Sequence, residues 1–176
     1  MPFVPNHLSV LGIIHTAISI LAIIAALIAL ALYGKLSPSK FFGQAYIWLT
    51  VLTCLTALPI MKTGHPTPGH FLAIIILVLI PIAIYANSIP LLKKIGPYVQ
   101  IFLLSTTLFL SMIPTTVETL TRLPISHPIA DGPNDPKIQT GLLIFVVLYI
   151  VGVTYQLFKL RRSKKKASGT TPDMAV

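Results

Sequence analysis

Five long stretches of this sequence contain no charged residue, and their length restricts the fold more than any other feature. Each stretch reaches the roughly 20 residues that an α-helix needs to cross a hydrocarbon core about 30 Å thick. Lipid offers no partner to backbone N–H and C=O groups, and the stretches are too long and too uniformly apolar for barrel strands, so each is predicted to be a helix. The stretches without Lys, Arg, Asp or Glu are residues 1–34, 41–61, 63–92, 95–117 and 138–158.

The chain is therefore predicted to be an all-α integral membrane bundle with five transmembrane helices. Its composition agrees, because only 10% of the residues are charged, against about 25% in a soluble domain. We expect a transmembrane domain over residues 1–160 and a basic, disordered cytoplasmic tail over residues 161–176. The helices are predicted at residues 9–33, 43–61, 70–89, 98–117 and 139–158.

The positive charges predict the orientation of the helices. Cytoplasmic loops of membrane proteins carry an excess of Lys and Arg. With five spans, most basic residues share a side with the carboxyl terminus, so we expect this terminus in the cytoplasm, the amino terminus outside, and a bacterial cytoplasmic membrane. That side holds Lys35, Lys40, Lys93, Lys94, Lys159, Arg161, Arg162, Lys164, Lys165 and Lys166, and the other side holds Lys62, Arg122 and Lys137.

The net charge of +9 does not indicate a nucleic-acid partner. Six of the thirteen basic residues lie between Lys159 and Lys166, and the others lie between apolar runs. This arrangement is typical of a membrane topology signal and differs from a basic stripe that reads a groove. The predicted partners are the lipid bilayer and other membrane subunits.

Small and polar residues recur every three or four positions along several predicted helices. Helices in lipid associate through such residues, which allow backbones to approach closely. We expect these stripes to face inward, with a four-helix core from the first four helices and the fifth helix alongside. The stripes are Gly12, Thr16, Ser19, Ala22, Ala26 and Ala29; Gly43, Tyr46, Thr50, Thr53 and Ala57; Thr107, Ser111, Glu118 and Arg122; and a weaker one of Gly141, Leu148 and Gly152.

Histidines gather on the predicted outer side, which holds His7, His15, His65, His70 and His127. Counting residues from the inner lysines places His15, His70 and Glu118 within roughly 6 Å of one level, at the outer edge of the hydrocarbon. An ionisable group near membrane depth is costly and marks a functional site by default. We therefore predict that His15 and His70 hold one b-type haem or one metal ion. Glu118 and Arg122 would form an ion pair or orient an imidazole, and His65 and His127 are further outer-side candidates.

The same residues also have a simpler interpretation. His70 follows Pro-Gly at a helix start and could cap its own helix, and Glu118 could be satisfied by Arg122, four residues further on. Histidines in short loops are ordinary solvated residues. The sequence contains no metalloprotease, phosphate-loop or nucleophile-elbow motif, so it identifies no catalytic residue and leaves open whether the protein is an enzyme.

Several short motifs resemble a family of uncharacterised bacterial multi-pass membrane proteins. The resemblance covers about residues 8–130 and implies a multi-pass membrane fold without an established activity. The motifs are Ile14-His15-Thr16, Gly43-Gln44-Ala45-Tyr46, Leu52-Thr53-Cys54-Leu55-Thr56, Pro68-Gly69-His70-Phe71-Leu72-Ala73-Ile74, the segment from Glu118 to Pro124, and His127-Pro128.

The histidine layout is also similar to that of b-type cytochromes built on four-helix membrane bundles. In those proteins, histidines on helices n and n+2 clamp a haem. His15 and His70 match this layout on the first and third helices. The resemblance implies at most one haem, near the outer face, because the inner side contains no histidine.

Three functions remain open at this stage, and the sequence favours the first of them. The first is a membrane protein with a haem- or metal-binding redox site at its outer face. The second is a non-catalytic subunit or assembly factor of a larger membrane complex. The third is a small transporter. Pigment or metal in the purified protein would indicate the first function, co-purifying partners the second, and solute flux in liposomes the third.

Overall fold

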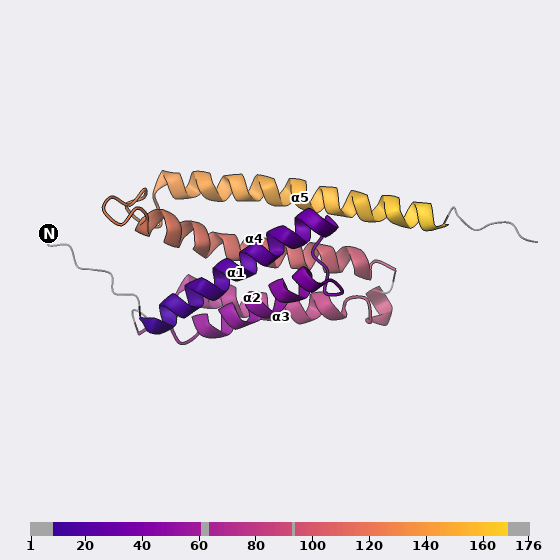
Figure 1. Ribbon diagram of the computed structural model, residues 1–176, viewed down its shortest axis with the longest axis horizontal. Helices are drawn as coiled ribbons and strands as arrows, with labels where there is room; N and C mark the ends of the chain where they lie inside the picture. Colours follow the sequence, from indigo (N-terminus) through magenta and orange to yellow (C-terminus); the bar gives the residue numbers. More distant parts are fainter. Residues whose placement is uncertain (1–8, 61–63, 93, 169–176) are drawn as a thin grey trace, which may run out of the picture. The chain divides into compact units, whose positions relative to one another are not determined.

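The computed structural model describes residues 9–60, 64–92 and 94–168, and these residues form helices without any strand (Figure 1). The long helices lie one after another along the chain, with short connections. In order, they are α1 (Val10–Tyr33), α2 (Phe41–Ala57), α3 (Pro68–Tyr85), the short 3₁₀ helix η1 (Pro90–Leu92), α4 (Gly96–Arg122) and α5 (Pro136–Ser168).

Four of these helices, α1, α3, α4 and α5, are long and apolar enough to cross a membrane. The predicted all-α, multi-pass membrane fold is therefore confirmed. The remaining helix, α2, is apolar but has 17 residues, which span about 26 Å at 1.5 Å per residue. This length falls slightly short of a hydrocarbon core about 30 Å thick.

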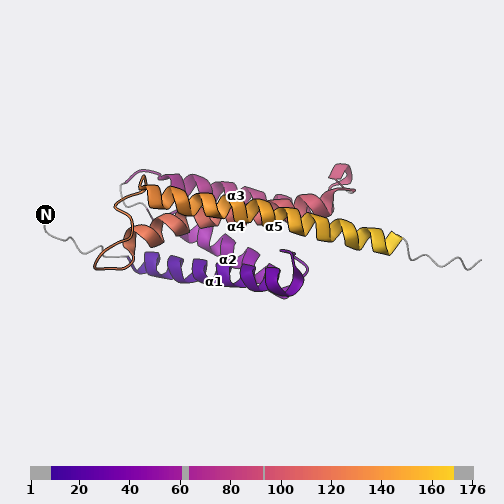
Figure 2. The ribbon, with the colours of Figure 1, turned by 90° about the horizontal axis from the view of Figure 1, so that it is seen from above.

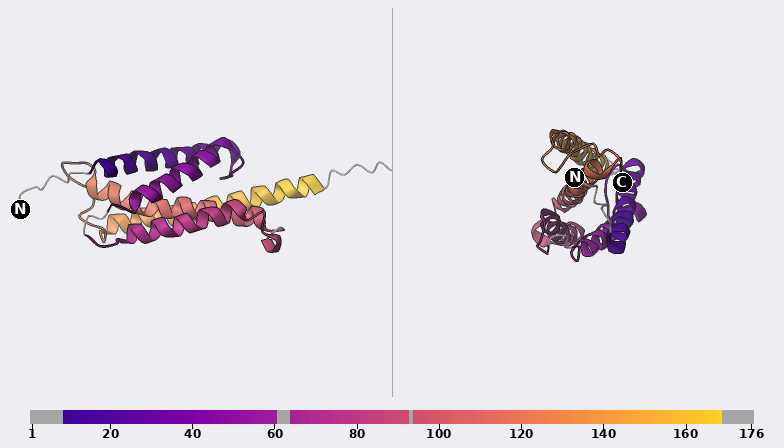
Figure 3. Two further views of the ribbon diagram at one scale, coloured as in Figure 1. Left: turned by 90° about the horizontal axis from the view of Figure 1, so that it is seen from below. Right: turned by 90° about the vertical axis from the view of Figure 1, so that its left-hand side faces the viewer.

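The chain divides into two compact units. The first unit is Met1–Ile84 and contains α1, α2 and α3, and the second is Tyr85–Val176 and contains η1, α4 and α5. Within the first unit, α1 and α2 pack together as a helical hairpin, and within the second unit α4 packs along α5 (Figures 2 and 3).

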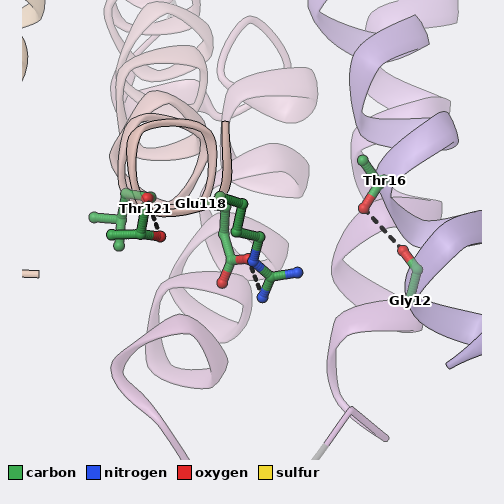
Figure 4. A network of polar contacts seen from close by, with 6 residues as sticks. Gly12, Thr16, Glu118 and Thr121 are labelled. Atoms are coloured by element: carbon green, nitrogen blue, oxygen red, sulfur yellow. Dashed lines mark hydrogen bonds and ion pairs between the residues drawn. The ribbon is translucent and has the colours of Figure 1, made fainter. Parts of the chain in front are cut away.

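One side of α1 carries a stripe of small residues, and most of them are buried, as their spacing predicts. Gly12, Ala22, Ala26 and Ala29 are buried, which lets α2 approach closely because small side chains do not hold the backbones apart. The prediction is wrong for Thr16, which is exposed. Its hydroxyl donates to the carbonyl of Gly12 at 2.8 Å (Figure 4), so it is satisfied within its own helix.

The turn between α1 and α2 fixes the start of the second helix. Gly34 ends α1 in the left-handed conformation, at φ 66°, and its N–H donates to the Leu30 carbonyl. After Ser37, which is almost fully buried, the chain enters α2, and Gly43 lies against the Ser37 backbone. A Cβ atom at position 43 would lie 1.9 Å from the Ser37 carbonyl oxygen. The close approach therefore requires glycine.

In α3, one face is buried throughout the helix. The helix continues past Pro81, which lies on the exposed side. The buried positions follow each other at intervals of three or four residues and are His70, Ala73, Ile76, Ile80 and Ala83.

Aromatic and polar side chains join α4 to α5 in the second unit. Tyr149 donates to or accepts from the Thr106 hydroxyl at 2.8 Å, and its ring stacks on Phe109 with centroids 5.0 Å apart. Further along, the Gln156 amide donates to the Ser105 hydroxyl at 3.1 Å, with both side chains buried. These contacts run in opposite directions along the two helices, so α4 and α5 are antiparallel.

The weaker stripe predicted for α5 is wrong at two of its three positions. Leu148 is 58% exposed, and Gly152 has no atom within 4 Å of an added Cβ. Gly141 does face α4, with Thr116 3.1 Å from an added Cβ. The face that packs on α4 instead follows Tyr149 and Gln156, because bulky polar side chains there find partners that glycine cannot offer.

The predicted disordered tail begins too early. The helix α5 continues through Arg161 and Arg162 to Ser168, and residues 169–176 lie outside the described residues. Lys and Arg are good helix formers. A helix already nucleated by a membrane span extends through them without a new nucleation cost.

The close approach at Gly43 gives a stability prediction. We expect Gly43→Ala to lower the free energy of unfolding by about 1–3 kcal/mol, because overpacking forces the Ser37 turn to move. Thermal unfolding of the detergent-purified protein measures the change. The matched control is Gly152→Ala, which adds the same atom to open space and favours the helix. Equal melting temperatures for the two variants would contradict the tight contact at position 43.

Candidate functional site

His15 connects α1 to α2. Its Nδ1 lies 3.1 Å from the Thr53 carbonyl oxygen and 3.1 Å from the Thr56 hydroxyl. A carbonyl oxygen can only accept, so Nδ1 must carry the proton. In the neutral ring, the lone pair is then on Nε2. This is the tautomer of a metal-bound histidine, which commonly donates its other N–H to a carbonyl or carboxylate.

His70 has the opposite arrangement. The Thr67 backbone N–H donates to its Nδ1 at 3.0 Å, and the Thr67 hydroxyl lies 2.9 Å from the same atom. Nδ1 is therefore an acceptor, and in the neutral ring the proton is on Nε2. This side chain is buried, and its Nε2 has no hydrogen-bond partner in the described structure. Ligation of a metal through Nε2 would require the bond from the Thr67 N–H to break.

The two histidines therefore differ in chemistry, although both belong to the first unit. His15 holds two helices together, and His70 caps the first turn of its own helix. Within the described residues, no three or more His, Cys, Asp or Glu side chains come together as a metal-binding group.

Glu118 and Arg122 form an ion pair on the last turns of α4 (Figure 4). The carboxylate is about half exposed and the guanidinium is more buried, at 23% exposure. An i, i+4 pair in this order stabilises a helix modestly. Nearby, Thr121 donates to the Val117 carbonyl at 2.7 Å, so its hydroxyl is satisfied within the helix (Figure 4).

The loop from α4 to α5 is organised around Asp135. Its carboxylate accepts from the backbone N–H of Lys137 at 2.8 Å and from that of Asp131 at 3.0 Å. The Lys137 ammonium donates to the Ile129 carbonyl at 2.6 Å. These bonds lower the pKa of the Asp135 carboxyl, mainly through the N–H of Lys137 and then through that of Asp131.

Two of the other histidines lie in loops, and the third lies outside the described residues. His65 and His127 are exposed in loops. The His127 backbone N–H donates to the Pro124 carbonyl at 3.2 Å. His7 lies outside the described residues. Among the described histidines, His15 and His70 are therefore the two that lie within helices.

Several buried polar residues were not predicted as candidates. Ser105 and Gln156 meet between α4 and α5, and a Gln in an otherwise apolar span is the signal that could have identified them. In α2, the buried hydroxyls of Thr50 and Thr53 have no hydrogen-bond partner in the described structure. Threonine in a helix usually bonds the carbonyl of the preceding turn, so the sequence gives no signal for these two.

Comparisons of the chain with protein-family models, with curated proteins and with solved structures find no match.

The Asp135 cluster gives a pH-dependent prediction. The carboxyl pKa is lower in the folded protein than its ordinary value of 3.8. Its contribution to stability is therefore complete above about pH 4 and is lost as the pH falls through the lowered folded-state value. We expect Asp135→Asn to reduce the melting temperature at pH 6 and to make much less difference at pH 3.

Thermal unfolding in detergent across this pH range measures the effect. The control is Asp131→Asn, because Asp131 contributes its main-chain N–H to the cluster and that group survives the change. A constant difference between the wild type and Asp135→Asn at all pH values would show that the carboxylate charge does not hold the loop.

Proposed function

We propose that this protein is a non-catalytic multi-pass membrane protein that serves as a subunit or assembly factor of a larger membrane complex. The observation that carries this proposal is the use of its polar side chains at membrane depth. His15 connects two helices, His70 caps one, and Glu118 pairs with Arg122. Histidines and charged residues at this depth often have a functional role in membrane proteins, whereas the contacts of these residues stabilise the helices.

The open faces of α1 and α5 leave room for another helix within the membrane. In the apolar window of α5 only 11% of the residues are buried, and in that of α1 only 22%. Gly152 leaves open space on α5, and a small residue on an open membrane face lets another helix approach closely.

A second candidate is the binding of one haem or one metal ion near the outer face by His15 and His70. Two observations favour it. The Nδ1–H of His15 is already bonded to a carbonyl, as in metal-bound histidines. In addition, the three buried polar atoms that lack a partner in the described structure all belong to the first unit, at Thr50, Thr53 and His70.

One purification separates the two candidates. We expect protein solubilised from its native membrane in mild detergent to be colourless and metal-free, and to co-purify with other membrane proteins in fixed stoichiometry. The measurements are an absorbance spectrum, elemental analysis and identification of the co-purifying chains.

The opposite result would replace the first candidate with the second. That result is a Soret band that shifts on reduction, or a near-stoichiometric metal, that is lost in His15→Ala and in His70→Ala. The control is His127→Ala, which changes an exposed loop residue and should leave the spectrum unchanged.

We also propose that the amino terminus lies outside and the carboxyl terminus in the cytoplasm of a bacterial cell, with the protein in the cytoplasmic membrane. The basic residues support this orientation. Lys35 and Lys40 lie in the turn between α1 and α2. In the second unit, Lys164 lies over the Tyr98 ring at 4.7 Å, so the basic end of α5 and the start of α4 share one end.

Reporter fusion and labelling test this orientation. A reporter fused after Val176 should be active in the cytoplasm, and a cysteine introduced at the exposed Ser126 should react with a membrane-impermeant reagent from outside. The native Cys54 is buried and serves as the unreactive control. A tail outside the cytoplasm together with Ser126 labelled from outside would mean that the number of spans is wrong by one, and a tail outside with Ser126 unlabelled would mean the inverted orientation.

A further inference from the structure

The helix α5 is longer than a membrane span requires. It has 33 residues, which measure about 50 Å at 1.5 Å per residue. A bilayer is about 40–45 Å thick including its headgroups. Within the second unit, the last turns of α5 extend beyond the start of α4, as the views agree (Figures 1 and 2). The end of α5 therefore lies at or beyond the membrane surface.

This end of the helix carries a dense positive charge. We call Lys159, Arg161, Arg162, Lys164 and Lys165 the basic segment. All five side chains are exposed, and α5 contains no Asp or Glu. At 100° per residue, these positions cover about 220° of the helix. The uncharged sector holds Leu160 and Ser163 and lies on the side of Gln156, whose amide contacts α4, so the charge covers the side of the helix that α4 leaves open.

Aromatic contacts place the basic segment at the boundary between lipid and water. Lys164 lies 4.7 Å from the centre of the Tyr98 ring, and Lys159 lies 5.9 Å from that of Tyr155. Tyrosine is enriched at the level of the headgroups, with its ring toward the hydrocarbon and its hydroxyl in water. Lysines beside such rings are suited to the depth of the lipid phosphates.

We propose that the basic segment binds the headgroups of anionic phospholipids. Positive charge over the whole side of the helix that α4 leaves open suits a layer of lipid phosphates, which can cover that side. Clusters of four to eight Lys and Arg next to a span are suited to anionic lipids. The two arginines can each bind a phosphate through two parallel N–H groups. This inference is independent of the proposed function.

The test compares lipid binding by the detergent-purified full chain and two variants. Native mass spectrometry measures how many molecules of phosphatidylglycerol and of phosphatidylcholine remain bound as each lipid is titrated. One basic residue near a membrane surface contributes about 1 kcal/mol, which is a factor of about five. We expect Arg161→Gln/Arg162→Gln to weaken phosphatidylglycerol binding at least tenfold and to leave phosphatidylcholine binding unchanged.

The matched control is Lys35→Gln/Lys40→Gln, which removes two charges from the turn between α1 and α2. It should change phosphatidylglycerol binding less than twofold. A chloride salt should weaken the preference of the wild type for phosphatidylglycerol, because salt screens exposed charges. Inorganic phosphate at the same ionic strength should weaken this preference no more than chloride does. Equal losses in the two variants, or no preference for phosphatidylglycerol in the wild type, would overturn the proposal. Circular dichroism of both variants shows that a loss of binding is not a loss of helix.

Discussion

The absence of water inside a bilayer is the constraint on which this structure depends. Each backbone N–H and C=O group in the hydrocarbon must find a partner in the chain, and a polar side chain is costly there without one. Helices meet this requirement for the backbone, and hydroxyl side chains meet it by bonding the carbonyl of the preceding turn. Ser111 donates to Thr107 and Thr116 donates to Met112 in this way. The polar sequence of α4 therefore does not make the helix surface polar.

Polar groups that cannot be satisfied within their own helix determine how helices pair. The His15 N–H reaches the Thr53 carbonyl across α1 and α2, and the Gln156 amide reaches Ser105 across α5 and α4. An amide or imidazole left alone in lipid costs several kcal/mol (about 2–7). Each contact therefore favours one register of its helix pair, and on α1 the small residues of the stripe allow α2 to approach.

The sequence predicts the spans well and the helix faces only in part, for a physical reason. Crossing a bilayer depends on length and hydropathy, which are properties of one segment. The inward side of a helix depends on its partner. Thr16 and Leu148 share the spacing of their stripes and yet are exposed, because lipid accepts small, apolar and self-bonded residues as readily as a neighbouring helix does. Similarly, the end of α5 passes beyond its apolar run because Lys and Arg continue a helix.

The candidate site shows what residue counting can predict and what it cannot. Counting along two helices places His15 and His70 at one depth, which is a statement about Cα positions. The chemistry of an imidazole depends on which ring nitrogen is already bonded. The carbonyl of Thr53 keeps the proton of His15 on Nδ1, and the N–H of Thr67 keeps that of His70 on Nε2. The partner of His15 is not visible in the spacing, because another helix supplies it. The partner of His70 is local, three residues before it, and agrees with the simpler interpretation that His70 caps its own helix. Two histidines that counting places at one depth thus differ in role, because His15 connects two helices and His70 caps one.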